Sequence, residues 1–221
     1  MKVIVFGATG MVGQGVLHEC LAHPDIDAIL VVGRSPCGVR DGRLREIVHG
    51  DLYDYTGIES ELAGYDACFF CLGVSAAGMT EGDYHHVTYD LTLAAAKALL
   101  KQDPGMTFIY VSGAGTDGTE RGGAMWARVK GKTENALLGL GFKSAYMFRP
   151  GYIQPMRGVR SRTGWYRAMY VVLGPLYPVL KTLAPNQVTT SEHVGRAMIR
   201  VAQQGYTKTV VDSRDINALA G

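Results

Sequence analysis

A glycine-rich loop near the start of the chain constrains the fold more than any other feature. Residues 7–13 read Gly-Ala-Thr-Gly-Met-Val-Gly, directly after an apolar run and at the start of a helical pattern. Glycines in this context permit a tight strand-to-helix turn and let the backbone approach a pyrophosphate. The helix N-terminus would then present its N–H groups and positive dipole end to the phosphates. The expected dinucleotide-binding residues of this loop are Gly7, Thr9, Gly10, Met11, Val12 and Gly13.

The first 150 residues alternate strand-like and helix-like segments. Strands are expected at Lys2–Phe6, Ala28–Val32, Leu44–Val48, Ala67–Leu72, Thr107–Val111 and Ser144–Phe148. Helices are expected at Met11–Ala22, Ile58–Leu62, Glu81–Lys101 and Ala124–Leu138. Such alternation, with strands apolar on both faces, predicts a parallel sheet covered by helices on its two sides. The fold class is therefore α/β, a doubly wound Rossmann-type sheet.

The alternation stops after Pro150. We expect one domain over residues 1–221, in which 151–208 contains a small substrate-side lobe, a helix at Val194–Gln203 and a late strand at Thr209–Asp212. Only 13 uncharged residues separate Arg167 from Lys181, and two prolines interrupt them. A membrane-spanning helix needs about 20, so a span is excluded, whereas a helix lying on a membrane surface is a disfavoured alternative.

Composition narrows the classes of partner. The 29 glycines show no collagen period, and a net charge of +2 does not indicate nucleic-acid binding. Between Asn135 and Ser191 there is no acidic residue but there are seven basic ones. Arg157, Arg160 and Arg162 in this region fit an anionic small-molecule substrate or the cofactor phosphate, and equally a solvated loop. The oligomeric state is left open.

Four cysteines bear on metal binding and compartment. Cys68 and Cys71 form a C-x-x-C pattern, but it lies in a strand-like run. Positions three apart on a strand face opposite sides, so buried thiols are expected and no metal site. With no visible signal peptide, a reducing cytoplasm is the expected location.

The end of the second strand bears on the choice of cofactor. Arg34 and Ser35 stand where dinucleotide folds that read an unphosphorylated ribose carry an acidic residue. An arginine there can pair with a 2′-phosphate. NADP is therefore preferred over NAD.

Four motifs follow one another along the chain: GATGMVG at 7–13, Gly50-Asp51-Leu52, Ser112 and Arg149-Pro150-Gly151. Together they resemble the atypical, extended-type short-chain dehydrogenase/reductase superfamily. Over roughly residues 1–155 the chain is similar to compact NAD(P)-binding oxidoreductases of the Tat-interacting-protein type. The resemblance implies further cofactor contacts. These are Asp51 and Leu52 at the adenine, Cys71, Leu72 and Gly73 over its ribose, and Pro150, Gly151, Tyr152 and Ile153 beside the nicotinamide.

The chain departs from this superfamily at its Tyr-x-x-x-Lys motif. Lys130 stands at the Lys position, but Trp126 stands at the Tyr position, and an indole exchanges no proton near neutral pH. The resemblance implies that Lys130 binds the nicotinamide ribose and that Ser112 polarises a carbonyl; both would contact the cofactor. Tyr152 or water is the candidate substitute acid. Two hypotheses follow: an NADP-dependent oxidoreductase of atypical mechanism acting on a small carbonyl or hydroxyl compound, or a non-catalytic NAD(P)-binding redox sensor or regulatory protein.

Overall fold

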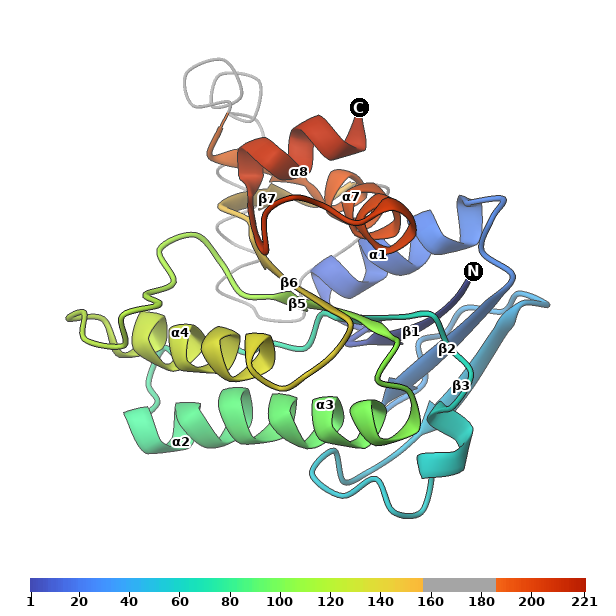
Figure 1. The fold of residues 1–221 in the computed structure, drawn as a ribbon, viewed down its shortest axis with the longest axis horizontal. Helices are drawn as coiled ribbons and strands as arrows, with labels where there is room; N and C mark the ends of the chain where they lie inside the picture. Colours follow the sequence, from blue (N-terminus) through green and yellow to red (C-terminus); the bar gives the residue numbers. More distant parts are fainter. Residues whose placement is uncertain (157–185) are drawn as a thin grey trace.

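The computed structural model describes residues 1–156 and 186–221, and a seven-stranded sheet runs through it (Figure 1). The strands are β1 (Lys2–Phe6), β2 (Ala28–Gly33), β3 (Leu44–Val48), β4 (Ala67–Phe70), β5 (Thr107–Val111), β6 (Ser144–Arg149) and β9 (Val210–Asp212). Their order is β3-β2-β1-β4-β5-β6-β9, and every pairing is parallel. The order reverses between β1 and β4, which makes the sheet a doubly wound Rossmann sheet.

Helices cover both faces of the sheet (Figure 1). One face carries α1 (Met11–Ala22), α7 (Ser191–Gln204) and α8 (Ser213–Ala220). The other carries α2 (Glu81–His85), the π-helical turn η2 (His86–Asp90), α3 (Leu91–Gln102) and α4 (Met125–Leu138), with the 3-10 turn η1 (Glu59–Leu62) beside them. Alternate residues of each strand enter the two cores, and this two-sided burial explains the unbroken apolar runs in the sequence.

The structure confirms the predicted fold class, and most predicted boundaries agree within two residues. Among the described residues, three elements were not predicted: β7 (Tyr152–Gln154), β8 (Val188–Thr190) and α8. The helix expected at Glu81–Lys101 is present but is interrupted by η2. Helix α7, expected within the substrate-side lobe, packs against α1 in the sheet core. Arg157, Arg160 and Arg162 lie outside the described residues, and the division between domain and lobe stays a prediction.

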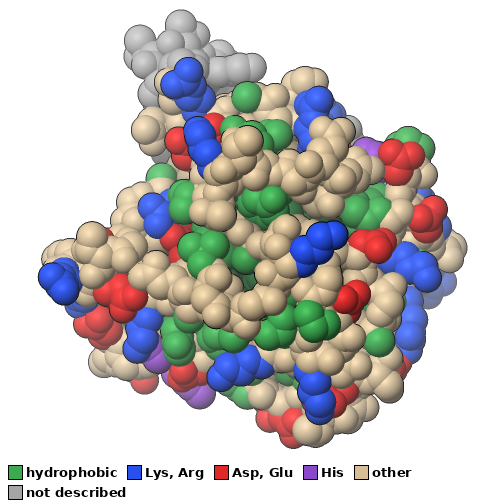
Figure 2. All heavy atoms as spheres, viewed as in Figure 1, with side chains coloured by type: hydrophobic (Ala, Val, Ile, Leu, Met, Phe, Trp, Pro, Cys, Tyr) green, Lys and Arg blue, Asp and Glu red, His purple; other side chains and the backbone are tan. Residues whose placement is uncertain are grey.

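The cysteines lie as the strand pattern predicts. Cys68 is buried in the core under α3, whereas Cys71 packs into the core under α1. All four cysteines are free thiols, and in the described ranges no group of three or more His, Cys, Asp or Glu side chains could hold a metal ion. Within the same ranges no helix is long and apolar enough to cross a membrane. Figure 2 shows acidic and basic side chains interspersed over the visible face.

Candidate dinucleotide-binding site

The carboxyl ends of the parallel strands bring the predicted cofactor loops together. Gly7 directly follows β1 and has a φ of +78°, which favours glycine. A Cβ on Gly7 would lie 2.8 Å from the backbone of Cys71 and Leu72, so the loops after β1 and β4 touch. These loops flank the point where strand order reverses, which is where open α/β sheets bind their ligands.

The N-terminus of α1 is open to an anion. Its N-cap, Gly10, makes no side-chain cap hydrogen bond, and the first turn contains no acidic residue. By contrast, side chains of Thr80, Thr190 and Asp212 cap α2, α7 and α8. A Cβ on Gly13 would lie only 2.1 Å from the Gly7 carbonyl oxygen, so the helix sits directly against the turn. The uncapped N–H groups and this close approach fit a bound pyrophosphate.

Arg34 and Ser35 follow β2 at the same edge of the sheet. The Arg34 side chain is exposed, and no hydrogen bond or ion pair to it occurs within residues 1–156 and 186–221. Ser35 is half-buried. Arg34 is thus an exposed cation at the strand end where a dinucleotide fold places its ribose-reading residue.

The segment after β3 packs against the end of β1, the strand that precedes the glycine loop. Leu52 is buried, and Tyr55 packs edge-on against Phe6, the last residue of β1, with ring centroids 6.2 Å apart. Asp51, directly before Leu52, is exposed, and its carboxylate accepts a hydrogen bond from the Tyr53 backbone N–H at 2.9 Å. Leu52 shares a hydrophobic cluster with Phe6 at the end of β1, and the adenine contacts of Asp51 and Leu52 stay a prediction.

Residues 150–153 are held on the other side of this edge. Pro150 is buried, and the Gly151 N–H donates to Ser213 Oγ at 2.8 Å. Ile153 lies in β7, which pairs with β8. The Tyr152 hydroxyl donates to Gln154 Oε1 at 3.0 Å, and burial raises the pKa of Tyr152. A raised pKa makes this phenol a weaker proton donor than a free tyrosine.

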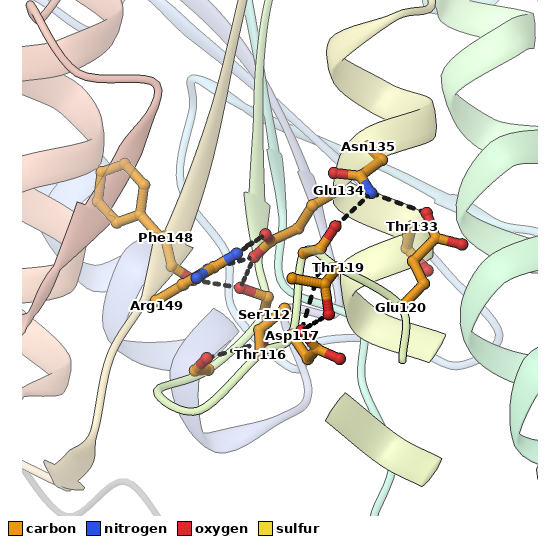
Figure 3. A network of polar contacts seen from close by, with 12 residues as sticks. Ser112, Thr116, Asp117, Thr119, Glu120, Thr133, Glu134, Asn135, Phe148 and Arg149 are labelled. Atoms are coloured by element: carbon orange, nitrogen blue, oxygen red, sulfur yellow. Dashed lines mark hydrogen bonds and ion pairs between the residues drawn. The ribbon is translucent and has the colours of Figure 1, made fainter. Parts of the chain in front are cut away.

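A buried carboxylate ties three elements together behind the site (Figure 3). Glu134 of α4 is 1% exposed, and its oxygens accept hydrogen bonds from Arg149 Nε at 3.0 and 3.1 Å and from Arg149 Nη2 at 2.5 Å. The Ser112 hydroxyl, at the end of β5, lies 2.5 Å from Glu134 Oε1 and 3.1 Å from the carbonyl oxygen of Phe148. Because a hydroxyl has one proton, the Ser112 proton serves this network and is not directed at a substrate carbonyl.

Lys130 is fixed on the same helix, one turn before Glu134. Its Nζ donates to the Ser112 carbonyl oxygen at 2.8 Å and lies 5.8 Å from the centroid of the Tyr110 ring. Burial lowers the pKa of Lys130 to about 8, and the Glu134 carboxylate opposes this shift. The ammonium is thus held at the end of β5 next to Ser112, and its contact with the nicotinamide ribose stays a prediction.

Trp126 opens α4 one turn before Lys130, and its indole packs against Gly115 of the loop after β5. Asp117 holds that loop by accepting from the backbone N–H groups of Thr119, Arg121 and Gly122; these bonds and one from the Thr119 hydroxyl lower its pKa to about 2. The indole therefore lies against a well-bonded loop.

Glu134 was missed by sequence reasoning. Its only signal was an acidic residue on a helix one turn after Lys130, which is typical of a solvated helix face. Arg149 was grouped with basic residues that suit an anionic ligand; the structure instead pairs it with Glu134. The spacing in sequence, 22 residues to Ser112 and 15 to Arg149, gives no hint that the three converge.

Comparison with known proteins fits this geometry. The sequence model of the NAD dependent epimerase/dehydratase family matches residues 3–125, which is more than half of the chain. The protein belongs to the NAD dependent epimerase/dehydratase family. The resemblance to extended short-chain dehydrogenases/reductases is thereby confirmed.

Similar sequences include fungal proteins. "Protein fmp52, mitochondrial" of Emericella nidulans is 29% identical over 206 residues, which cover 90% of this chain and 85% of that protein. "Protein FMP52, mitochondrial" of Meyerozyma guilliermondii is 25% identical over 231 residues, covering 100% of this chain and 95% of that protein. The expectation of a cytoplasmic location is wrong by this comparison, because these relatives are named as mitochondrial. The absence of a visible signal peptide did not justify that expectation.

Solved structures with the same fold include dehydrogenases. The short-chain dehydrogenase/reductase YIR035C of Saccharomyces cerevisiae has a TM-score of 0.67 at 14% identity, with coverage of 99% of this chain and 98% of that one. The enzyme WbmF of Bordetella bronchiseptica, solved in complex with NAD⁺, has a TM-score of 0.67 at 16% identity, with coverage of 99% and 76%. At these identities the likeness establishes the fold.

The Glu134 network predicts a large stability difference between two glutamate substitutions. Glu134→Gln removes the charge facing the half-buried Arg149 and should lower the free energy of unfolding by about 3 kcal/mol. Glu59→Gln breaks the exposed Lys101–Glu59 pair, 2.8 Å in length, and should cost about 0.5 kcal/mol. Urea unfolding followed by circular dichroism measures both. Equal costs would mean that Glu134 does not act as a buried counter-charge.

The lowered pKa of Lys130 predicts a pH-dependent stability term. Between pH 8 and about 10.5 the unfolded chain binds the Lys130 proton and the folded chain releases it, so the free energy of unfolding rises with pH in this window. Between pH 7.5 and 9.5 the free energy of unfolding of the wild type should rise by about 2 kcal/mol more than that of a Lys130→Met variant. Urea titrations of both proteins at the two pH values measure the difference. A constant difference would show that burial does not depress this pKa.

Proposed function

We propose that this protein is an NADP-dependent oxidoreductase of atypical mechanism that acts on a small carbonyl or hydroxyl compound. The observation that carries the proposal is the combination at one sheet edge: the uncapped N-terminus of α1, the exposed Arg34 and the fixed Lys130. When bound, NADPH supplies a hydride. Gly7, Gly10 and Gly13 admit its pyrophosphate, and Arg34 with Ser35 pairs with the 2′-phosphate.

Lys130 has the central role around the reacting atoms. Its ammonium donates one hydrogen bond to the Ser112 carbonyl oxygen. The remaining N–H groups of the ammonium can donate to the nicotinamide ribose hydroxyls. Trp126 supplies an apolar wall and an N–H donor in place of a proton-exchanging phenol. The proton that carbonyl reduction consumes comes from water or from Tyr152. Because no tyrosine stands beside Lys130 to donate a proton, general acid catalysis is weaker than in an enzyme with the Tyr-x-x-x-Lys motif. A larger share of the rate enhancement then comes from orientation of the substrate against the cofactor.

A second function has its own supporting observation. The Ser112 hydroxyl is bonded to Glu134, and Trp126 replaces the tyrosine. Neither of the two hydroxyl groups that usually contact the substrate oxygen is therefore available to do so. A non-catalytic NAD(P)-binding redox sensor or regulatory protein would retain the cofactor half of the site alone. The partner of the oxidoreductase is a small molecule, whereas the partner of the sensor would be another protein.

Cofactor preference is tested at Arg34. The wild-type protein should bind NADP⁺ about tenfold or more tightly than NAD⁺, because a charge-assisted contact to phosphate contributes roughly 1.5–3 kcal/mol. Arg34→Ala should remove this preference while leaving the Kd for NAD⁺ unchanged. Isothermal titration calorimetry measures all four affinities. Equal affinity of the wild-type protein for both cofactors, with Arg34→Ala indifferent, would refute the assignment to NADP.

Turnover separates the two functions. The assay follows the oxidation of NADPH at 340 nm with a panel of small aldehydes and ketones. The wild type should turn over, and Lys130→Met should lower the rate at least 100-fold. Trp126→Tyr should raise kcat by restoring a proton donor beside Lys130, and Tyr152→Phe distinguishes Tyr152 from water as the acid. Tight NADP⁺ binding without turnover in the wild type and without any gain in Trp126→Tyr would favour the sensor.

A further inference from the structure

An exposed aromatic pair stands beside the candidate cofactor site. The rings of Tyr53 and His86 are stacked, with centroids 4.5 Å apart and planes 5° apart. The Tyr53 hydroxyl also donates to the backbone carbonyl oxygen of His86 at 3.4 Å. Yet Tyr53 is 38% exposed and the His86 side chain is 60% exposed. Neither residue belongs to the two hydrophobic cores, so the pair is a stack at the surface of the molecule.

Local contacts hold both members in place. The backbone N–H of Tyr53 donates to Asp51 Oδ1 at 2.9 Å, forming a tight turn after β3. His86 Nδ1 lies 3.1 Å from Asp90 Oδ2, one turn further along the π-helical segment η2. A π-helical turn is costly and frequent at functional sites. The turn after β3 thus holds Tyr53, and the π-helical segment η2 holds His86.

The stack lies where the adenine end of a dinucleotide is expected. Its neighbours in sequence, Leu52 and Tyr55, are buried, and Tyr55 packs on Phe6 at the end of β1. Partial burial and then the Asp90 carboxylate raise the pKa of Tyr53, while the Arg34 guanidinium lowers it. The ring is therefore within electrostatic range of Arg34, the residue proposed to pair with the 2′-phosphate of the adenosine ribose.

We propose that the Tyr53–His86 stack is an aromatic platform for the adenine ring of the cofactor. His86 covers one face of the Tyr53 ring, and the exposed remainder of that ring offers the adenine a flat apolar surface. Stacking on an aromatic side chain suits any purine and needs no hydrogen-bond readout. This inference rests on the proposed dinucleotide function, and it assigns the adenine contact to two residues outside the motif set, in addition to Asp51 and Leu52.

The test separates the two halves of the dinucleotide. 5′-AMP and nicotinamide mononucleotide share a ribose 5′-phosphate but differ in the base. Tyr53→Leu should weaken binding of AMP and of NADP⁺ about tenfold, in keeping with the loss of one base–aromatic contact, and leave the mononucleotide unchanged. Tyr53→Phe keeps the ring and should stay within about threefold of wild type. His86→Ala should give a loss between these two.

Tyr65→Leu is the matched control. Tyr65 is also partly exposed but precedes β4, at the amino edge of the sheet. Its loss should leave AMP binding unchanged. Circular dichroism confirms that each variant folds, and saturation-transfer NMR on wild type should show the strongest transfer to the adenine H2 and H8 protons.

The outcomes distinguish the inference from the function on which it rests. If the wild type binds NADP⁺ and AMP but Tyr53→Leu binds them equally well, the platform is refuted and the cofactor proposal stands. If the wild type binds neither nucleotide, the cofactor proposal itself fails. A loss in Tyr53→Leu that extends equally to nicotinamide mononucleotide would indicate general damage to the edge and would also refute the platform.

Discussion

The contact of α1 with the turn that precedes it is the constraint on which the site depends. At Gly13 any side chain would collide with the Gly7 carbonyl oxygen, and at Gly7 it would collide with the loop after β4. Because both positions are glycine, the first turn of α1 can lie against the point between β1 and β4 where the strand order reverses. Its first N–H groups then have no side-chain cap. The same contact that closes the fold thereby places an uncapped helix N-terminus at the switch point, where the proposed function needs an anion site.

A second contact stabilises the opposite half of the edge. Glu134 joins α4, the end of β5 and the end of β6, and Lys130 is attached to this unit through the Ser112 carbonyl oxygen. Removing one charge from a buried pair is costly, so Glu134 and Arg149 depend on each other for stability. Glu134 also engages the Ser112 hydroxyl. The site is thus well ordered for binding a cofactor while both usual proton-handling hydroxyls are engaged or replaced, which is why binding and turnover need separate experiments.

The parts of the structure that repeat a simple period were predictable from the sequence. The strands β1 and β5 and the helix α1 were predicted to the residue because each strand carries an apolar run and the helix follows a clear glycine loop. Strands β7 and β8 were missed because three residues show little alternation, although the equally short β9 was expected to within one residue. The cofactor loops were predictable since they are continuous in sequence. Glu134 and the Tyr53–His86 stack were not, because their partners come from distant elements.

The central claim is that this edge of the sheet binds NADP in preference to NAD. Native mass spectrometry of the protein incubated with equimolar NADP⁺ and NAD⁺ tests it most directly, since both cofactors compete for one site. We expect the NADP⁺ adduct to dominate, with the NAD⁺ adduct about tenfold less abundant. Equal adducts, a dominant NAD⁺ adduct or no adduct would contradict the claim.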